Sequence, residues 1–221
     1  MDFSNIFYEY INQKYEKRFL KILSSRLRND NIEQVDYLIE EIGQKTPLIY
    51  EAYIKNNILK DRLSRVHIRV ASLFLSAYSS LRICYKEKET LLEILEEISS
   101  KIFLKEMKFF LNLSFLFSKN KLIAIWNYFF LIQQSFIKFF FQNYIKIEKD
   151  YKDKKIHIIL KPEIYIVFFE KHKSSFLSLS CISYFDSIID IIKNYYKELE
   201  VEKEENLEDN SISYLIYYKD K

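Results

Sequence analysis

Apolar residues recur every three or four positions through the N-terminal half of the chain, and this spacing predicts a series of amphipathic helices. The first covers about residues 3–28 and ends at the polar stretch Asn29-Asp30-Asn31. The second begins after that stretch and ends at Gly43, because a helix terminus favours a glycine in the left-handed conformation. Thr46-Pro47, a capping hydroxyl followed by a proline, predicts the start of a long helix that continues to about Lys88.

Two further helices are predicted over about residues 89–113 and 119–146. The second of them is apolar on nearly every side, with Trp126 and Phe130 on one face. Such a helix either forms the centre of a bundle or leaves one face for another subunit. A chain of 221 residues has limited surface with which to surround it. This favours packing against another subunit.

The hydrophobic period changes after residue 147. Residues 148–155 (EKDYKDKK) are charged and indicate a linker, and Ile156, Ile158 and Leu160 then alternate along a predicted strand. Further strands are predicted over 164–169, 176–184 and 214–218, a short helix begins at Asp186, and an acidic segment covers 198–209. The predicted fold class is mainly α, with an N-terminal helical bundle domain (1–147), a charged linker (148–155) and a small, β-rich α+β domain (156–221).

Composition limits the chemistry that the chain can perform. Gly43 is the only glycine, and the P-loop and the Rossmann turn need several glycines, so the common nucleotide-binding enzymes are excluded. His67, His157 and His172 have no carboxylate or cysteine at ligand spacing, and no HExxH, paired CxxC or GxSxG motif is present. The sequence therefore predicts a protein that is not an enzyme and that holds no cofactor or metal.

Residues 109–141 are very apolar and raise the question of a membrane span. A spanning helix needs roughly 20 predominantly apolar residues, and the longest charge-free stretch, 122–137, is shorter and contains amide side chains. A helix covered by protein is the preferred interpretation, and a membrane-associated helical protein using residues 109–141 is the alternative. The separate cysteines Cys84 and Cys181, and a first segment without the pattern of a signal peptide, predict a reducing cytosol or nucleus.

Arg62, Arg65 and Arg69 lie on one face of the predicted helix that ends near Lys88. This face is either solvated or forms a basic stripe that pairs with acidic residues of a partner. The net charge is only +3, with acids and bases interleaved, so direct DNA binding is expected to be weak or absent. If the arginines did bind nucleic acid, the affinity would depend steeply on salt.

Three groups of residues resemble the Sld-five type subunit of the GINS replication complex in their order and spacing. They are Arg69-Val70, Leu75-Ser76-Ala77-Tyr78, Arg82 and Lys86-Glu87-Lys88; then Phe117 to Leu122 with Tyr128-Phe129 and Ile137; then Lys161-Pro162-Glu163-Ile164. The chain departs from the family at Ser79-Ser80, where more basic residues are usual, and in lacking the glycines of the β domain. The closing motif of that domain matches either Ile182-Ser183-Tyr184 or Leu215 to Lys219.

The resemblance implies a scaffold and not a catalyst. Three other GINS-type subunits would complete a heterotetramer that holds a RecJ-like cofactor on the MCM ring and activates this replicative helicase in the nucleus. No small-molecule substrate is implied, and Asp2 to Ile11 is similar to a hub-binding peptide that some members carry. A sister subunit shares this domain order. The residues expected at the partner interface are Arg62, Arg65, Arg69, Tyr78, Arg82, Trp126, Phe130 and Pro162.

Overall fold

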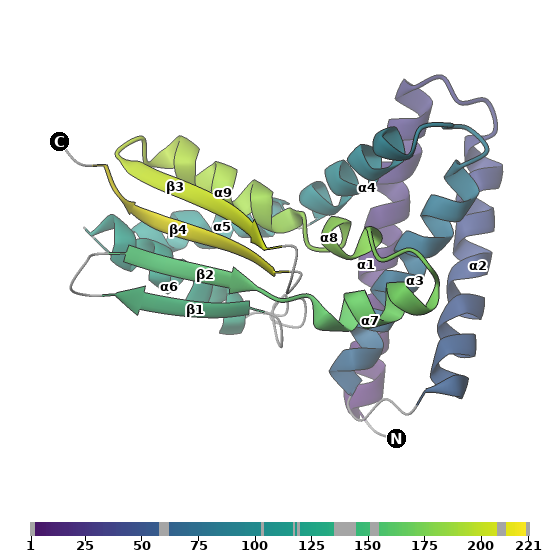
Figure 1. The fold of residues 1–221 in the computed structure, drawn as a ribbon, viewed down its shortest axis with the longest axis horizontal. Helices are drawn as coiled ribbons and strands as arrows, with labels where there is room; N and C mark the ends of the chain where they lie inside the picture. Colours follow the sequence, from purple (N-terminus) through teal and green to yellow (C-terminus); the bar gives the residue numbers. More distant parts are fainter. Residues whose placement is uncertain are drawn as a thin grey trace. The chain divides into compact units, whose positions relative to one another are not determined.

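The computed structural model describes residues 3–57, 62–102, 104–116, 118, 120–134, 145–150, 155–206 and 211–219. The chain forms two compact units, and each is built from two separate segments (Figure 1). The helical unit contains Met1–Ile102 and Ile164–Tyr184, and the sheet unit contains Phe103–Glu163 and Phe185–Lys221. Helices dominate and one small antiparallel sheet is present, so the predicted fold class is confirmed.

The predicted domain boundary over 148–155 is wrong, because the chain changes unit elsewhere. Residues 104–134 belong with the sheet, and the segment after Glu163 returns to the helical unit. Part of the predicted linker is itself a strand, since Ile145–Asp150 pairs with Lys155–Leu160. A charged sequence is compatible with an edge strand, because charges there protect the unpaired backbone from further strands.

The helical unit is organised around one central helix. Its elements are α1 (Phe3–Asn29), α2 (Val35–Asn56), α3 (Arg62–Leu81), α4 (Lys88–Ile102), α7 (Glu163–Lys171) and α8 (Leu177–Ser180). α3 contacts α1, α2, α4 and α8 (Figure 1). Small side chains on α3 let these neighbours approach closely, and the buried hydroxyls of Ser72 and Ser76 donate hydrogen bonds to Ile68 O (2.8 Å) and Ser72 O (2.7 Å) of the same helix.

α2 runs without interruption through both residues that were expected to separate two helices. Gly43 does not adopt a positive φ, and Pro47 lies inside the helix. Proline removes one backbone hydrogen bond at a cost of about 3 kcal/mol, but the buried stripe of Leu38, Ile42 and Tyr53 extends across it. The predicted helix from Thr46 to Lys88 is therefore wrong: its first part belongs to α2, and α3 ends at Leu81.

Two predicted strands in the C-terminal third are helical. Residues 164–169 lie in α7, where Tyr165, Phe168 and Phe169 are buried at helical spacing, and residues 177–180 form α8. β-branched and aromatic residues favour strands only when a pleated surface is available for them to pack on. Here Pro162 and Glu163 precede and open a helix, and the apolar run provides its buried face.

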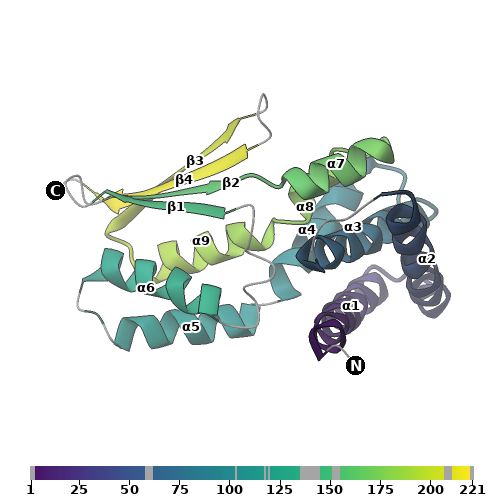
Figure 2. The ribbon, with the colours of Figure 1, turned by 90° about the horizontal axis from the view of Figure 1, so that it is seen from below.

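The sheet unit has four antiparallel strands in the order β1-β2-β4-β3. Its elements are α5 (Leu104–Leu116), α6 (Lys121–Gln134), β1 (Ile145–Asp150), β2 (Lys155–Leu160), α9 (Tyr184–Tyr195), β3 (Leu199–Asn206) and β4 (Ser211–Tyr218). The helix predicted over 89–113 is two helices, α4 and α5. The helix predicted over 119–146 corresponds to α6, and its last two residues begin β1. The acidic segment 198–209 contains β3. Figure 2 shows α5, α6 and α9 on one side of the sheet.

The alternation predicted for β2 is confirmed. Ile156, Ile158 and Leu160 are buried, and the residues between them are half-buried. β2 pairs with β4 so that Ile158 lies opposite Tyr214, and both side chains are buried. The helices cover this face of the sheet, and the helix predicted at Asp186 is present as α9.

Candidate protein-interaction surface

The predicted arginine stripe on α3 is partly used inside the helical unit. Nη2 of Arg69 lies 3.0 Å from Oε2 of Glu16 on α1, and its guanidinium lies 5.4 Å from the ring centre of Tyr50 on α2. Arg69 therefore joins three helices of one unit. Arg65 is exposed, and the side chain of Arg62 lies outside the described residues.

The other residues predicted at the interface occupy different environments. Tyr78 packs edge-on against Phe176 at 5.2 Å between ring centres, Arg82 is exposed, and Pro162 is buried. Trp126 is half-buried on α6. Tyr78 and Arg82 belong to the helical unit, and Trp126 and Pro162 to the sheet unit, so no single unit brings the predicted set together. The side chain of Phe130, and the segment Asp2 to Tyr8 of the proposed hub-binding peptide, lie outside the described side chains.

α6 is covered on one broad side by its own unit. Leu122, Ile125 and Phe129 are buried, and the ring of Phe129 stacks on that of Phe185 at 5.8 Å. Ile123 points elsewhere and remains 41% exposed. One exposed apolar side chain does not make an uncovered face, so the prediction that this helix packs against another subunit stays a prediction.

A more exposed apolar face lies on α5, and sequence reasoning missed it. Met107, Leu111 and Ser114 are buried on one side of this helix. Phe109 and Leu116 lie seven residues apart on the other side and are 62% and 80% exposed. We define the α5 outer face as the exposed residues Lys105, Lys108, Phe109, Asn112 and Leu116.

Single exposed apolar side chains are normal on protein surfaces. The α5 outer face differs because two large apolar side chains share one helical face and lysines flank them. Its signal in the sequence was the seven-residue spacing of Phe109 and Leu116. That spacing is equally typical of a buried stripe, so the sequence could not show which side of α5 faces solvent. An apolar centre with a polar rim is the usual composition of a protein-interaction surface.

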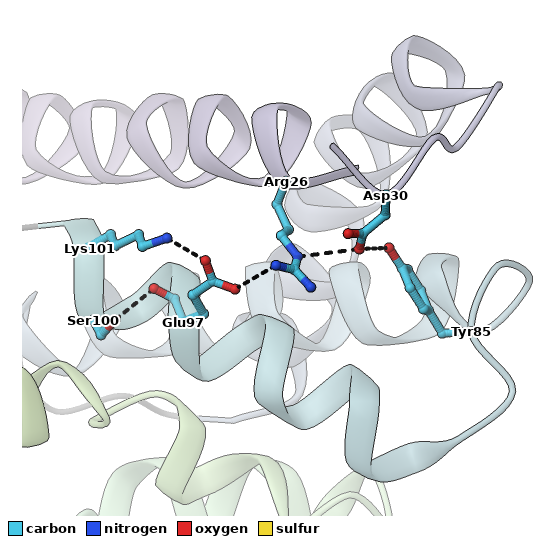
Figure 3. Close-up of polar contacts among 6 residues, drawn as sticks. All are labelled: Arg26, Asp30, Tyr85, Glu97, Ser100 and Lys101. Carbon is cyan, nitrogen blue, oxygen red and sulfur yellow. Dashed lines mark hydrogen bonds and ion pairs between the residues drawn. The ribbon is translucent and has the colours of Figure 1, made fainter. Parts of the chain in front are cut away.

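A second polar site joins α1 to α4 in the helical unit (Figure 3). The guanidinium of Arg26 lies 3.3 Å from Asp30 and 3.4 Å from Glu97, and Glu97 also pairs with Lys101. The Tyr85 hydroxyl donates a hydrogen bond of 2.6 Å to Asp30. Burial, and then this contact with a carboxylate, raise the pKa of Tyr85. Each carboxylate of this cluster is paired with a basic side chain. The cluster therefore links α1 to α4, and its ion pairs are explained by this structural role.

The three histidines have different surroundings. Nδ1 of buried His67 lies 2.8 Å from the Tyr165 hydroxyl, and Nδ1 of His157 lies 3.9 Å from Glu148. Burial and the neighbouring lysine lower the pKa of His172, which is exposed in the turn after α7. Within the described ranges, no group of three or more metal-ligating side chains converges.

No helix that the structure describes combines the length and the apolar composition needed to cross a bilayer. Part of the segment 109–141 lies outside the described residues.

Neither a scan against protein-family models nor a search of curated proteins finds a match to this chain. Among solved structures, a Cs H-NOX mutant that carries 4-cyano-L-phenylalanine at site 5 is similar over 81% of this chain and 95% of its own, with 13% sequence identity and a TM-score of 0.30. A likeness at this TM-score carries no argument about function.

Proposed function

We propose that this protein is a non-enzymatic scaffold subunit of a heteromeric assembly and that the α5 outer face packs against another subunit. The observation that supports this most directly is the exposure of Phe109 and Leu116 on the same face of α5. Burying two such side chains in an interface contributes about 1.5–3 kcal/mol each. The lysines at the rim would keep the free surface soluble and would select acidic residues on the partner.

The more specific proposal is a GINS-type heterotetramer that activates the MCM helicase in the nucleus. It is supported by the order of the three groups of residues that resemble the Sld-five type subunit. All three are helical in part: the first lies largely in α3, the second continues into α6, and the third leads into α7. In this function the chain positions other proteins, and ATP hydrolysis belongs to the helicase ring.

The test is affinity purification of the tagged full chain from its native cells, followed by mass spectrometry and native mass measurement. We expect three other subunits, one copy each, and the double substitution Phe109→Ser with Leu116→Ser should lower their recovery at least tenfold. Tyr37→Ser is the matched control, because Tyr37 is 63% exposed on α2 of the other unit. Recovery of the protein alone as a stable monomer would contradict the scaffold proposal, and recovery only with detergent-solubilised membranes would favour the membrane alternative.

A further inference from the structure

A cavity of about 400 Å³ that is open to solvent lies in the sheet unit where α9 ends and β3 begins. Most of its polar lining is basic. The lining residues are Lys193, Lys197, Leu199, Glu200, Val201 and Lys219. Cavities of roughly 300–1,000 Å³ are the usual size for small-molecule sites.

The backbone holds the three lysines at this cavity. Lys193 is in the last turn of α9 and Lys197 follows four residues later, beyond the helix end. The amide of Lys219 donates a hydrogen bond of 3.0 Å to Glu198 O, immediately after Lys197. Because Leu199 also pairs with Tyr218 across the sheet, regular secondary structure fixes the chain on both sides of the cavity.

The carboxylate between Lys197 and Leu199 is already paired with another lysine, because Glu198 pairs with Lys121. No ion pair joins Lys193, Lys197 or Lys219 to any residue that the structure describes; Asp220, which follows Lys219, lies outside that part.

The charge at the cavity is therefore positive. Its lining contains three lysines and one carboxylic acid, Glu200. The C-terminal end of α9 adds the equivalent of roughly half a negative charge, which offsets only part of the excess. Leu199 and Val201 add an apolar wall, against which the organic part of a ligand can pack.

We propose that this cavity binds a small molecule that carries at least two negative charges on phosphate groups. Lysine binds phosphate as a point charge, and three lysines with one acid suit a diphosphate or a bisphosphorylated ester better than a single carboxylate. The same phosphate chemistry occurs in soluble metabolites and in phosphoinositide head groups. This site is separate from the α5 outer face and does not depend on the scaffold function.

The experiment is calorimetric titration of the full chain with inorganic pyrophosphate at low salt. We expect saturable binding that weakens as salt is added. Lys193→Gln with Lys197→Gln should weaken it about tenfold, because each lost charge pair weakens binding roughly three- to fivefold. The matched control is Lys17→Gln with Lys21→Gln, two exposed lysines at the same spacing on α1, which should leave the affinity unchanged.

Weaker binding by the lysine variant could also result from misfolding, so a second variant is chosen that should bind more tightly. Glu200→Gln removes the one acid of the cavity and should strengthen pyrophosphate binding about threefold, whereas Glu204→Gln, on the same strand, should not. Phosphatidylcholine vesicles with and without phosphatidylinositol bisphosphate distinguish a lipid head group from a soluble metabolite. Lysine-dependent binding only to the vesicles that contain the bisphosphate identifies a lipid head group as the ligand. Absence of binding in both formats, or equal losses in the two lysine pairs, overturns the proposal.

Discussion

Replacing Gly43 by alanine distinguishes one continuous α2 from two helices separated at this residue. Gly43 has no positive φ, and a Cβ built there meets no atom within 4 Å. Alanine in a helix interior is more favourable than glycine by about 0.8–1 kcal/mol. Gly43→Ala should therefore raise the free energy of unfolding of the helical unit by about 1 kcal/mol. If Gly43 were a left-handed cap, the same change would cost about 1–2 kcal/mol.

Pro47→Ala extends the test by restoring the backbone N–H that proline lacks inside α2. Proline is less favourable than alanine by about 3 kcal/mol in a helix interior. Greater freedom of the unfolded chain offsets about 0.4–1 kcal/mol of that difference, so the net gain is about 2 kcal/mol. A proline at the first position of a separate helix would give no such gain, because its N–H would have no partner there.

The assay is urea unfolding followed by far-UV circular dichroism, with thermal unfolding as a second measurement. For a protein of 150–250 residues, 1 kcal/mol corresponds to a shift in Tm of about 2–4 °C. Gln44→Ala is the control, because this exposed neighbour bonds only to Glu40 on the helix surface and should change stability by less than about 0.5 kcal/mol. A decrease in stability for both Gly43→Ala and Pro47→Ala would refute a continuous α2.

Three further predictions concern single side chains. Phe74→Ala should lower the free energy of unfolding by about 3–5 kcal/mol, because this ring is fully buried, whereas Phe109→Ala should change it by less than about 0.5 kcal/mol in the isolated protein; urea titration compares them. Tyr85→Phe should cost about 1 kcal/mol by removing the hydrogen bond to Asp30, and unchanged stability in the same titration would show that the bond is dispensable. Burial raises the pKa of Tyr128, so the folded state holds this proton more tightly than the unfolded state, and stability should fall as pH rises above about 10. Tyr128→Phe should make that fall shallower in urea titrations at a series of alkaline pH values.

The amphipathic patterns that face a single core were predictable from the sequence. The apolar stripe of α1, the alternation of Ile156, Ile158 and Leu160, and the helix containing Asp186 each follow from the period of their own residues. In these segments the local pattern and the tertiary packing favour the same structure.

Other segments could not be assigned from the sequence because the same local residue pattern is compatible with two different secondary structures. The aromatic and β-branched run 164–169 has the composition of a strand, but it provides the buried face of α7. Thr46-Pro47 has the composition of a helix start, but Thr46 is buried within α2 and its hydroxyl bonds to Ile42 O at 2.7 Å. In both cases packing partners far away in the sequence decide the outcome, and local propensity does not encode them.

The candidate interface was predicted only in part for the same reason. An uncovered face was expected on the apolar helix α6, but the exposed apolar residues Phe109 and Leu116 lie on α5. Arg69 was expected to contact an acidic residue of a partner protein. It is already paired with Glu16 of its own chain, 53 positions earlier. A stripe of arginines does not reveal whether its acidic partners lie in the same chain.

The division of each unit between two chain segments has a consequence for synthesis in the cell. The helical unit begins at the N-terminus but is completed by residues 164–184, and the sheet unit ends only with the last strand. During translation, helices α1 to α4 therefore emerge from the ribosome long before α7 and α8 can close over them. Cutting the chain at any single point between the segments therefore leaves at least one unit without part of its residues.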